Sequence, residues 1–83
     1  MTNDSPPRLT PAQLRAARGW LNLSQRELAQ TCAVNVKTIA DFERGASVPY
    51  DRTLRDIQHA LEERGAELLF EDGVGIGIKV RKL

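Results

Sequence analysis

The feature that most constrains this chain is a pair of short, capped helices separated by only about three residues. Ser24 is a favourable N-cap residue, and Glu27 stands three positions later, which is the pattern of a capping box. Asn35 is a second strong N-cap residue, and Gly45 can adopt the left-handed conformation that commonly follows a helix. The sequence therefore predicts one helix from Ser24 to about Thr31 and a second from Asn35 to Gly45.

The two predicted helices carry the residues needed to pack against each other. Ala29 lies in the middle of the first helix, where a small side chain lets the second helix approach closely. The other members of the shared apolar core are Leu28, Cys32, Val34, Ile39 and Phe42. This arrangement leaves the polar side of the second helix free.

A further helix is predicted on each side of this pair. Thr10 is the N-cap of the preceding helix, with Pro11 at its first position and Gln13 closing a second capping box. Asp51 is expected to cap the following helix, which ends at Gly65. Their apolar faces consist of Leu14, Ala17, Trp20 and Leu21 in one helix, and of Leu54, Ile57 and Leu61 in the other.

After this last helix the pattern changes to the alternation typical of a β-strand. The apolar residues Val74, Ile76, Ile78 and Val80 alternate with Gly75, Gly77, Lys79 and Arg81. The segment from Leu68 to Phe70 is a candidate partner strand, and Glu71-Asp72-Gly73 supplies turn residues between them. The sequence therefore predicts a C-terminal β-hairpin.

The length of 83 residues suits a single domain with one hydrophobic core. We expect residues 1–8 to form a flexible arm, residues 9–65 a helical domain and residues 66–83 the hairpin. The predicted fold is mainly α, with four to five helices and a C-terminal β-hairpin.

Composition argues against several classes of protein. Cys32 is the only cysteine and His59 the only histidine, so neither an internal disulfide nor an ordinary zinc site is expected. No apolar run approaches the roughly 20 residues of a membrane span, and nothing indicates export, so we expect a cytoplasmic protein with no membrane partner. There is no nucleophile with a partner base and no glycine-rich phosphate loop, so we expect no enzymatic activity, no cofactor and no metal.

The charge is nearly balanced, with a formal net charge of +1. The residues up to Asp56 contain eight basic and six acidic side chains, and the remainder contains four and five. A surface that binds an anionic polymer would therefore have to come from the arrangement of charges rather than from bulk basicity.

Two helices joined by a tight turn can cross at a large angle, so that one braces on a DNA backbone while the other enters the major groove. The residues with this pattern are Ser24-Gln25-x-x-Leu28-Ala29, Val34, Thr38-Ile39 and Phe42-Glu43-Arg44-Gly45. Together they resemble the phage Cro/CI repressor (XRE) family of helix-turn-helix proteins, over roughly Leu9 to Leu61. The resemblance implies a lambda-repressor-like domain that binds double-stranded DNA.

The resemblance also implies roles for individual residues. The phosphate-contacting positions are Gln25, Asn35, Thr38 and Arg44, and the base-reading positions are Val36, Lys37 and Asp41. Gln25 would in addition orient a side chain of the recognition helix. Arg18 and Glu43 resemble the family's partly buried ion pair, for which we favour a structural role over contact with DNA.

The chemistry of the three base-reading residues agrees with these roles. Lys37 can donate to guanine O6 and N7, Val36 can contact a thymine methyl group, and Asp41 could accept from cytosine N4. The alternative that these residues form an ordinary solvated helix face stays open. The family pattern is broken at Ala33, which occupies a turn position usually filled by glycine.

One such domain contacts only a few base pairs, so we expect a homodimer that binds an inverted repeat. The hairpin is the candidate interface, because an isolated hairpin with an apolar edge is marginal unless another strand pairs with it. Its interface residues would be Leu68, Phe70, Val74, Ile76, Ile78 and Val80. Alternatively, the hairpin folds over its own helices. We expect Trp20 and Phe70 to lie in the core or in an interface.

The predicted function is sequence-specific regulation of transcription, as a repressor, an autorepressor or a controller. The balanced charge keeps a second interpretation open, in which the same scaffold is a protein-interaction module such as an antitoxin or an anti-activator. Its partner would then be a toxin or another regulatory protein. Salt-dependent binding to DNA distinguishes the two.

Overall fold

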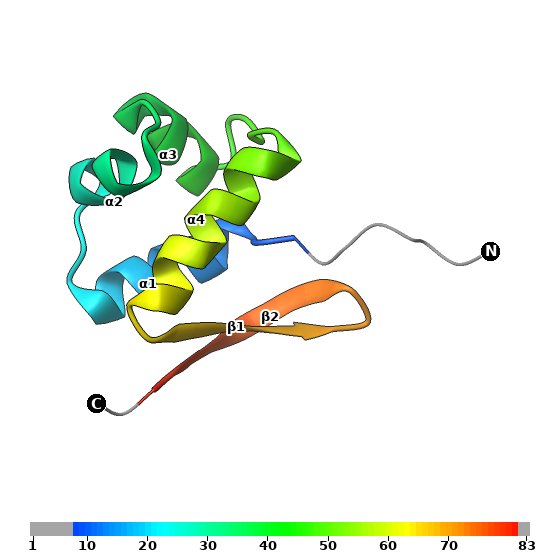
Figure 1. Cartoon of the computed structure of the whole chain (residues 1–83). Helices are drawn as coiled ribbons and strands as arrows, with labels where there is room; N and C mark the ends of the chain where they lie inside the picture. Colours follow the sequence, from blue (N-terminus) through cyan, green and yellow to red (C-terminus); the bar gives the residue numbers. More distant parts are fainter. Residues whose placement is uncertain (1–7, 82–83) are drawn as a thin grey trace.

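The capped segments fold into four helices, and the C-terminal segment folds into a two-stranded antiparallel sheet (Figure 1). The computed structural model describes residues 8–81. The elements are α1 (Pro11–Leu21), α2 (Gln25–Cys32), α3 (Val36–Glu43), α4 (Asp51–Glu63), β1 (Ala66–Glu71) and β2 (Val74–Val80). The predicted fold is confirmed, with four helices in the described part of the chain. Most of the predicted arm, residues 1–7, and residues 82–83 lie outside the described residues.

Both predicted capping boxes are present. The Thr10 hydroxyl accepts a hydrogen bond from the Gln13 backbone N–H at 3.1 Å, and Gln13 Oε1 accepts from the Thr10 N–H at 3.0 Å. The Ser24 hydroxyl and the Glu27 carboxylate make the same pair of contacts, each at 3.0 Å. These contacts satisfy N–H groups that have no partner inside a helix, and they determine where α1 and α2 begin.

The starts of α3 and α4 differ in how well they were predicted. Asn35 is the N-cap of α3, and its side-chain oxygen accepts from the Lys37 N–H at 2.8 Å. Asp51 was predicted as the N-cap of α4, and this is wrong, because the N-cap is Tyr50, whose backbone is extended and whose side chain makes no capping hydrogen bond. Asp51 is the first helical residue, where its carboxylate still interacts favourably with the helix dipole.

The turn between α2 and α3 keeps its usual shape despite the missing glycine. Ala33 adopts the left-handed conformation, with φ of 56° and ψ of 41°. The next backbone N–H, from Val34, donates to the Ala29 carbonyl at 3.0 Å and closes the end of α2. A non-glycine residue in this conformation costs about 1 kcal/mol, so the turn retains its geometry at a small loss of stability.

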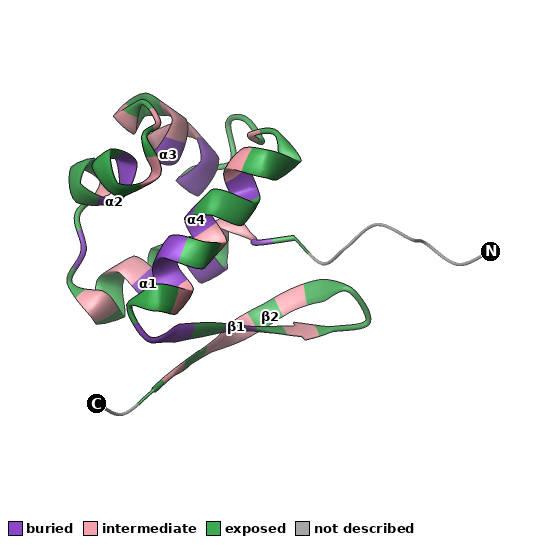
Figure 2. Cartoon of the chain, viewed as in Figure 1, coloured by how far each residue is buried: buried purple, intermediate pink, exposed green. Residues whose placement is uncertain are grey.

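The core lies between the four helices and is completed by the hairpin (Figure 2). Its largest fully buried side chains are Phe42, Leu14, Leu28, Ile39, Ile57 and Leu61. Trp20 was predicted to share the apolar face of α1, but it is 71% exposed and does not belong to the core. It lies two turns after Gln13 on the same side of α1, and the hairpin that buries Gln13 does not cover it.

The hairpin turn contains two residues rather than the predicted three. Glu71 pairs with Val74 and belongs to β1, and the turn consists of Asp72 and Gly73. Both have positive φ, of 52° and 80°. An Asp-Gly pair with positive φ at both positions is the type I′ turn that matches the twist of two antiparallel strands.

The predicted unbroken alternation of β2 is also wrong, because the strand contains a β-bulge. Leu69 pairs with Gly77 and Phe70 pairs with Gly75, so Ile76 is an extra residue with no partner on β1. An extra residue shifts the side-chain alternation by one position. As a result, Ile78 packs against the core whereas Val74 and Ile76 are exposed.

The inner face of the hairpin covers α1 and α4. Leu68 is buried there, and Phe70 and Ile78 pack against the core, so these three predicted interface residues contact their own helices. The outer face carries three exposed apolar side chains, Leu69, Val74 and Ile76. In Figure 1 the hairpin lies on one side of α1 and α4, and α3 lies at the opposite end of the molecule.

Candidate nucleic-acid interface

The second helix of the tight pair, α3, is held from behind by its buried residues. Ile39, Phe42 and Glu43 face the interior. Lys37 and Arg44 are exposed on the opposite side of the helix, and Asp41 lies between them. The structure therefore brings these three predicted DNA-contacting residues together on one accessible face.

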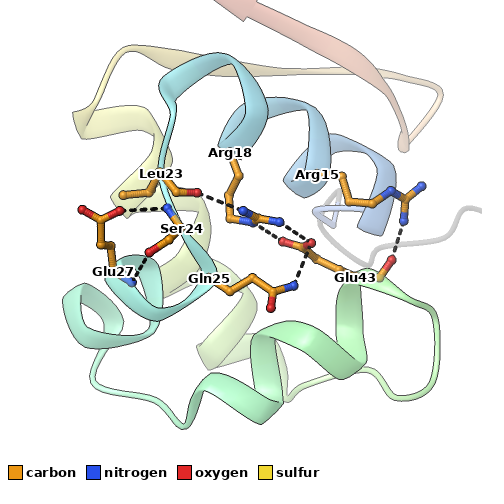
Figure 3. Close-up of polar contacts among 7 residues, drawn as sticks. All are labelled: Arg15, Arg18, Leu23, Ser24, Gln25, Glu27 and Glu43. Atoms are coloured by element: carbon orange, nitrogen blue, oxygen red, sulfur yellow. Dashed lines mark hydrogen bonds and ion pairs between the residues drawn. The ribbon is translucent and has the colours of Figure 1, made fainter.

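Glu43, at the last position of α3, is the centre of a polar network that joins three helices (Figure 3). The Glu43 side chain is only 6% exposed. Arg18 from α1 donates to both carboxylate oxygens, through Nε to Oε2 and through Nη2 to Oε1 at 2.7 Å. Gln25, the first residue of α2, also donates to Oε1 at 3.1 Å. The expected pairing of Arg18 with Glu43 is present in the structure.

The ionisation of this pair follows from its surroundings. Burial alone would raise the pKa of the Glu43 carboxyl group, but the hydrogen bonds from Arg18 and Gln25 outweigh burial and lower it. The hydrogen bond to Glu43 raises the pKa of Arg18, against the opposing effect of its own burial. Both groups are therefore charged at neutral pH, and the pair is a charge-assisted, bidentate contact.

Two further contacts attach the same region to α1. Arg18 donates through Nη1 to the Leu23 carbonyl at 2.9 Å, and Arg15 donates through Nη1 to the Glu43 backbone carbonyl. Arg15 was not selected from the sequence, although it lies three positions before Arg18 and therefore near the same side of α1. With these contacts, α1 fixes the orientation of α3 within the domain.

Gln25 was predicted to contact a phosphate and to orient a side chain of the recognition helix. Its amide nitrogen lies against Glu43, which is on that helix. The phosphate contact stays a prediction. It is compatible with the position of Gln25 at the N-terminus of α2, where backbone N–H groups favour an anion.

The exposed face of α3 carries a chain of three charges. Lys37 Nζ lies 2.8 Å from Asp41 Oδ2, and Arg44 Nη2 lies 2.8 Å from Asp41 Oδ1. The side chains of Lys37 and Arg44 are 73% and 66% exposed, whereas that of Asp41 is 20% exposed. Hydrogen bonds from Lys37 and then from Arg44 lower the pKa of Asp41, so its carboxylate is ionised at neutral pH.

The other predicted contact residues flank this face. Asn35 is exposed, and its side-chain oxygen is occupied by the capping contact. Thr38 is half-buried, and Val36 is half-buried and packs against the core. Base reading by Val36, Lys37 and Asp41 stays a prediction. Phosphate contacts by Asn35, Thr38 and Arg44 stay predictions as well.

A hollow of about 670 Å³ lies beside α3, and only one of its two walls was predicted from the sequence. The first wall includes Asn35, Lys37, Thr38 and Asp41. The second wall consists of Ser47, Val48, Pro49, Tyr50 and Thr53, from the loop after α3 and the start of α4. Val48 and Tyr50 are among the most exposed large apolar side chains of the described chain. The sequence between α3 and α4 carries no local motif that indicates this wall.

The described residues offer little for other kinds of site. They contain no group of three or more His, Cys, Asp or Glu side chains placed to hold a metal ion. Burial raises the pKa of the half-buried Cys32 thiol, which disfavours the reactive thiolate. Among residues 8–81, the helices are too short or too polar to cross a membrane.

A comparison with protein families identifies the same pair of helices as the structure does. No curated protein matches the sequence. A family model described as helix-turn-helix (HTH_3) matches residues 14–68, which include α2, the turn at Ala33 and α3. This family is a family of DNA-binding regulatory domains. The chain therefore belongs to the helix-turn-helix family of the Cro/CI (XRE) type.

Proposed function

We propose that this protein is a sequence-specific regulator of transcription that binds double-stranded DNA as a homodimer. The observation that carries the proposal is the position of α3. The network around Glu43 holds the helix from behind, and an accessible polar face remains in front. A helix presented in this way fits the major groove, which is roughly 12 Å wide.

The residues on and beside this face have distinct roles in the proposed complex. Lys37 is the principal base reader, because its ammonium group can donate to guanine O6 and N7. Val36 is a weaker candidate, since part of its side chain packs against the core. The phosphate contacts come from Gln25, Asn35, Thr38 and Arg44, which position the helix without reading sequence.

The loop that forms the second wall of the hollow extends this surface. Ser47 and Tyr50 line the hollow beside α3, and hydroxyl groups are common partners of phosphate oxygens. We therefore add Ser47 and Tyr50 to the proposed phosphate contacts.

Symmetry favours one way of forming the dimer. If the outer faces of two hairpins stacked on each other, the two α3 helices would lie on opposite sides of the assembly, because α3 and the hairpin lie at opposite ends of each protomer (Figure 1). If two hairpins instead pair edge to edge, both helical layers lie on the same side of one continuous four-stranded sheet. Only the second arrangement presents both α3 helices to one face of a DNA duplex.

The β1 edge is the better candidate for this pairing. The extra residue Ile76 interrupts the regular ladder of β2, and bulges are a common means of blunting an edge. β1 contains no such insertion, and its exposed Leu69 would lie near the same residue of the partner.

In this proposal, the protein regulates transcription by occupying an inverted repeat, most simply in the promoter of its own gene.

DNA binding is tested by footprinting the full-length protein on the DNA that flanks its own gene. The expected result is a protected inverted repeat with half-sites about one helical turn apart. Affinity for that site should fall steeply as the salt concentration rises. Absence of salt-dependent binding to this DNA, and to any duplex selected from a random pool, contradicts the proposal and favours the protein-interaction module.

The dimer is tested by sedimentation equilibrium of the full chain and of two charge variants. Leu69→Lys brings two like charges together at a paired β1 edge and should weaken self-association, whereas Ile76→Lys on β2 should change it little. Dissociation by Ile76→Lys alone would identify the β2 edge instead. Equal self-association of all three proteins would mean that the hairpin does not form the interface.

A further inference from the structure

Asp41 is an acidic residue in the middle of a surface that is proposed to approach a polyanion. Its two carboxylate oxygens each accept from a different cation, Oδ2 from Lys37 and Oδ1 from Arg44, both at 2.8 Å. Arg44 makes a second contact to Oδ1 through Nε at 3.3 Å. Lys37 lies four residues before Asp41, and Arg44, the C-cap residue of α3, lies three residues after it. Asp41 therefore holds both cations on the same side of the helix.

The cations keep donors that can still reach DNA. An ammonium group has three N–H donors and a guanidinium group has five. Lys37 uses one donor on Asp41, and Arg44 uses its Nε and Nη2 positions. Neither contact with Asp41 has to break before Lys37 meets a base or Arg44 meets a phosphate.

The same contacts reduce the positive charge of the face. The segment from Gln25 to Arg44 contains three basic residues, Arg26, Lys37 and Arg44, and two of them are bound to Asp41. Binding to random DNA depends almost entirely on such charges, because it consists of contacts with phosphate. A carboxylate between two cations therefore weakens random binding. At a cognate site, contacts with bases compensate for the affinity that is lost to this repulsion.

We propose that Asp41 sets the DNA specificity of α3 by holding Lys37 and Arg44 and by repelling phosphate, and that it does not itself contact a base. This inference rests on the DNA-binding function proposed above. It assigns to Asp41 a positioning role in place of the base contact that the family resemblance implies. The carboxylate repels the phosphates of every non-cognate sequence to the same extent. Its effect is therefore measured as the ratio of the affinity for a cognate duplex to the affinity for a non-cognate duplex.

The test compares Asp41→Asn with Glu63→Gln in the full-length protein. Both substitutions remove one negative charge and retain the size of the side chain. Glu63 is exposed at the end of α4, which lies beside the hairpin and away from α3 (Figure 1). The two probes are a duplex selected by the wild-type protein from a random pool and a scrambled duplex of the same composition. Circular dichroism checks that both variants are folded.

We expect Asp41→Asn to bind the scrambled duplex about two- to fivefold more tightly, which corresponds to the value of an exposed charge interaction. Its affinity for the selected duplex should change by less than about twofold. The slope of log affinity against log salt on the scrambled duplex should steepen by up to about 0.9 per new phosphate contact. Glu63→Gln should match the wild type on both probes.

Three other outcomes overturn the proposal in different ways. If Asp41→Asn loses affinity only for the selected duplex, Asp41 contacts a base. If Asp41→Asn and Glu63→Gln behave alike on both probes, Asp41 has no special role although DNA binding stands. If the wild-type protein selects no duplex and binds neither probe, the proposed function fails together with the role of Asp41.

Discussion

Gln13 and Gly75 lie in direct contact, and the contact leaves no room for a side chain at Gly75. A β-carbon there would lie 2.2 Å from Gln13 Oε1 and 2.6 Å from Gln13 Cδ. The Gln13 amide nitrogen donates to the Leu69 carbonyl at 2.9 Å and to the Gly77 carbonyl at 3.0 Å. Gln13, which is 2% exposed, therefore caps α1 and attaches both strands of the hairpin to that helix.

The first prediction concerns this contact. Gly75→Ala should lower the free energy of unfolding by about 1–3 kcal/mol, because the new methyl group displaces Gln13 from its hydrogen bonds. Gly77→Ala is the matched control, since a β-carbon at Gly77 would meet no neighbouring atom within 4 Å and the φ of Gly77 is not positive. It should be neutral or stabilising by up to about 1 kcal/mol. Urea unfolding measures both, and equal effects of the two variants would contradict the contact.

The second prediction concerns the pH dependence of Glu43. Because its folded-state pKa lies below the ordinary value of 4.5, the ionised carboxylate contributes stability above pH 4.5. This contribution is lost as the pH falls through the folded-state pKa. Glu43→Gln should therefore cost on the order of 3 kcal/mol at pH 7, because it leaves Arg18 partly buried without its partner. The difference from the wild type should narrow as the pH falls below 4.5.

Urea unfolding at several pH values checks this second prediction. The exposed Glu63→Gln variant is the control, and its difference from the wild type should be small throughout. A cost of Glu43→Gln that stays constant down to pH 3, about 1.5 units below the ordinary value of 4.5, would mean that ionisation of Glu43 does not stabilise the fold.

The third prediction separates base reading from phosphate contact. Lys37→Ala should change the preferred sequence, with a loss of about 1–3 kcal/mol at one base pair. Arg44→Ala and Gln25→Ala should weaken binding to all sequences, and Arg44→Ala should reduce the salt slope by about one. Selection from a random pool followed by salt titration measures both properties. Equal losses for all three variants on selected and random DNA would refute the assigned roles.

The fourth prediction concerns the turn between α2 and α3. Ala33→Gly removes the strain of a left-handed alanine, worth about 1 kcal/mol, but it also makes the unfolded chain more flexible. The net effect should be a stabilisation of up to about 0.5 kcal/mol. Ala16→Gly, at an exposed position inside α1, should instead destabilise by about 1 kcal/mol. The melting temperatures of the two variants should therefore shift in opposite directions from that of the wild type. A shift of both in the same direction would argue against strain at Ala33.

The parts of the fold that depend on neighbouring residues could be predicted from the sequence. The capping boxes of Thr10 and Ser24 and the cap at Asn35 were correct because each joins groups two or three residues apart. The pairing of Arg18 with Glu43 spans 25 residues, and only the family resemblance made it predictable.

The errors arose where distant segments meet. The bulge at Ile76 is not visible in the alternation of β2, because the alternation is set by pairing with β1. The exposure of Trp20 depends on where the hairpin stops covering α1, which local periodicity does not encode. Tyr50 and Ser47 lacked any local motif and became candidates only when the loop was seen to form a wall beside α3.

The attachment of Glu43 to α1 has a consequence for how a lineage of such proteins can change. Arg15 binds the backbone carbonyl of Glu43 and Arg18 binds its side chain, so the orientation of α3 depends on residues that face away from the groove. Lys37, whose side chain is 73% exposed, can then be exchanged with little disturbance of the scaffold. A new operator preference could arise from one or two substitutions, and the old fold would carry it unaltered.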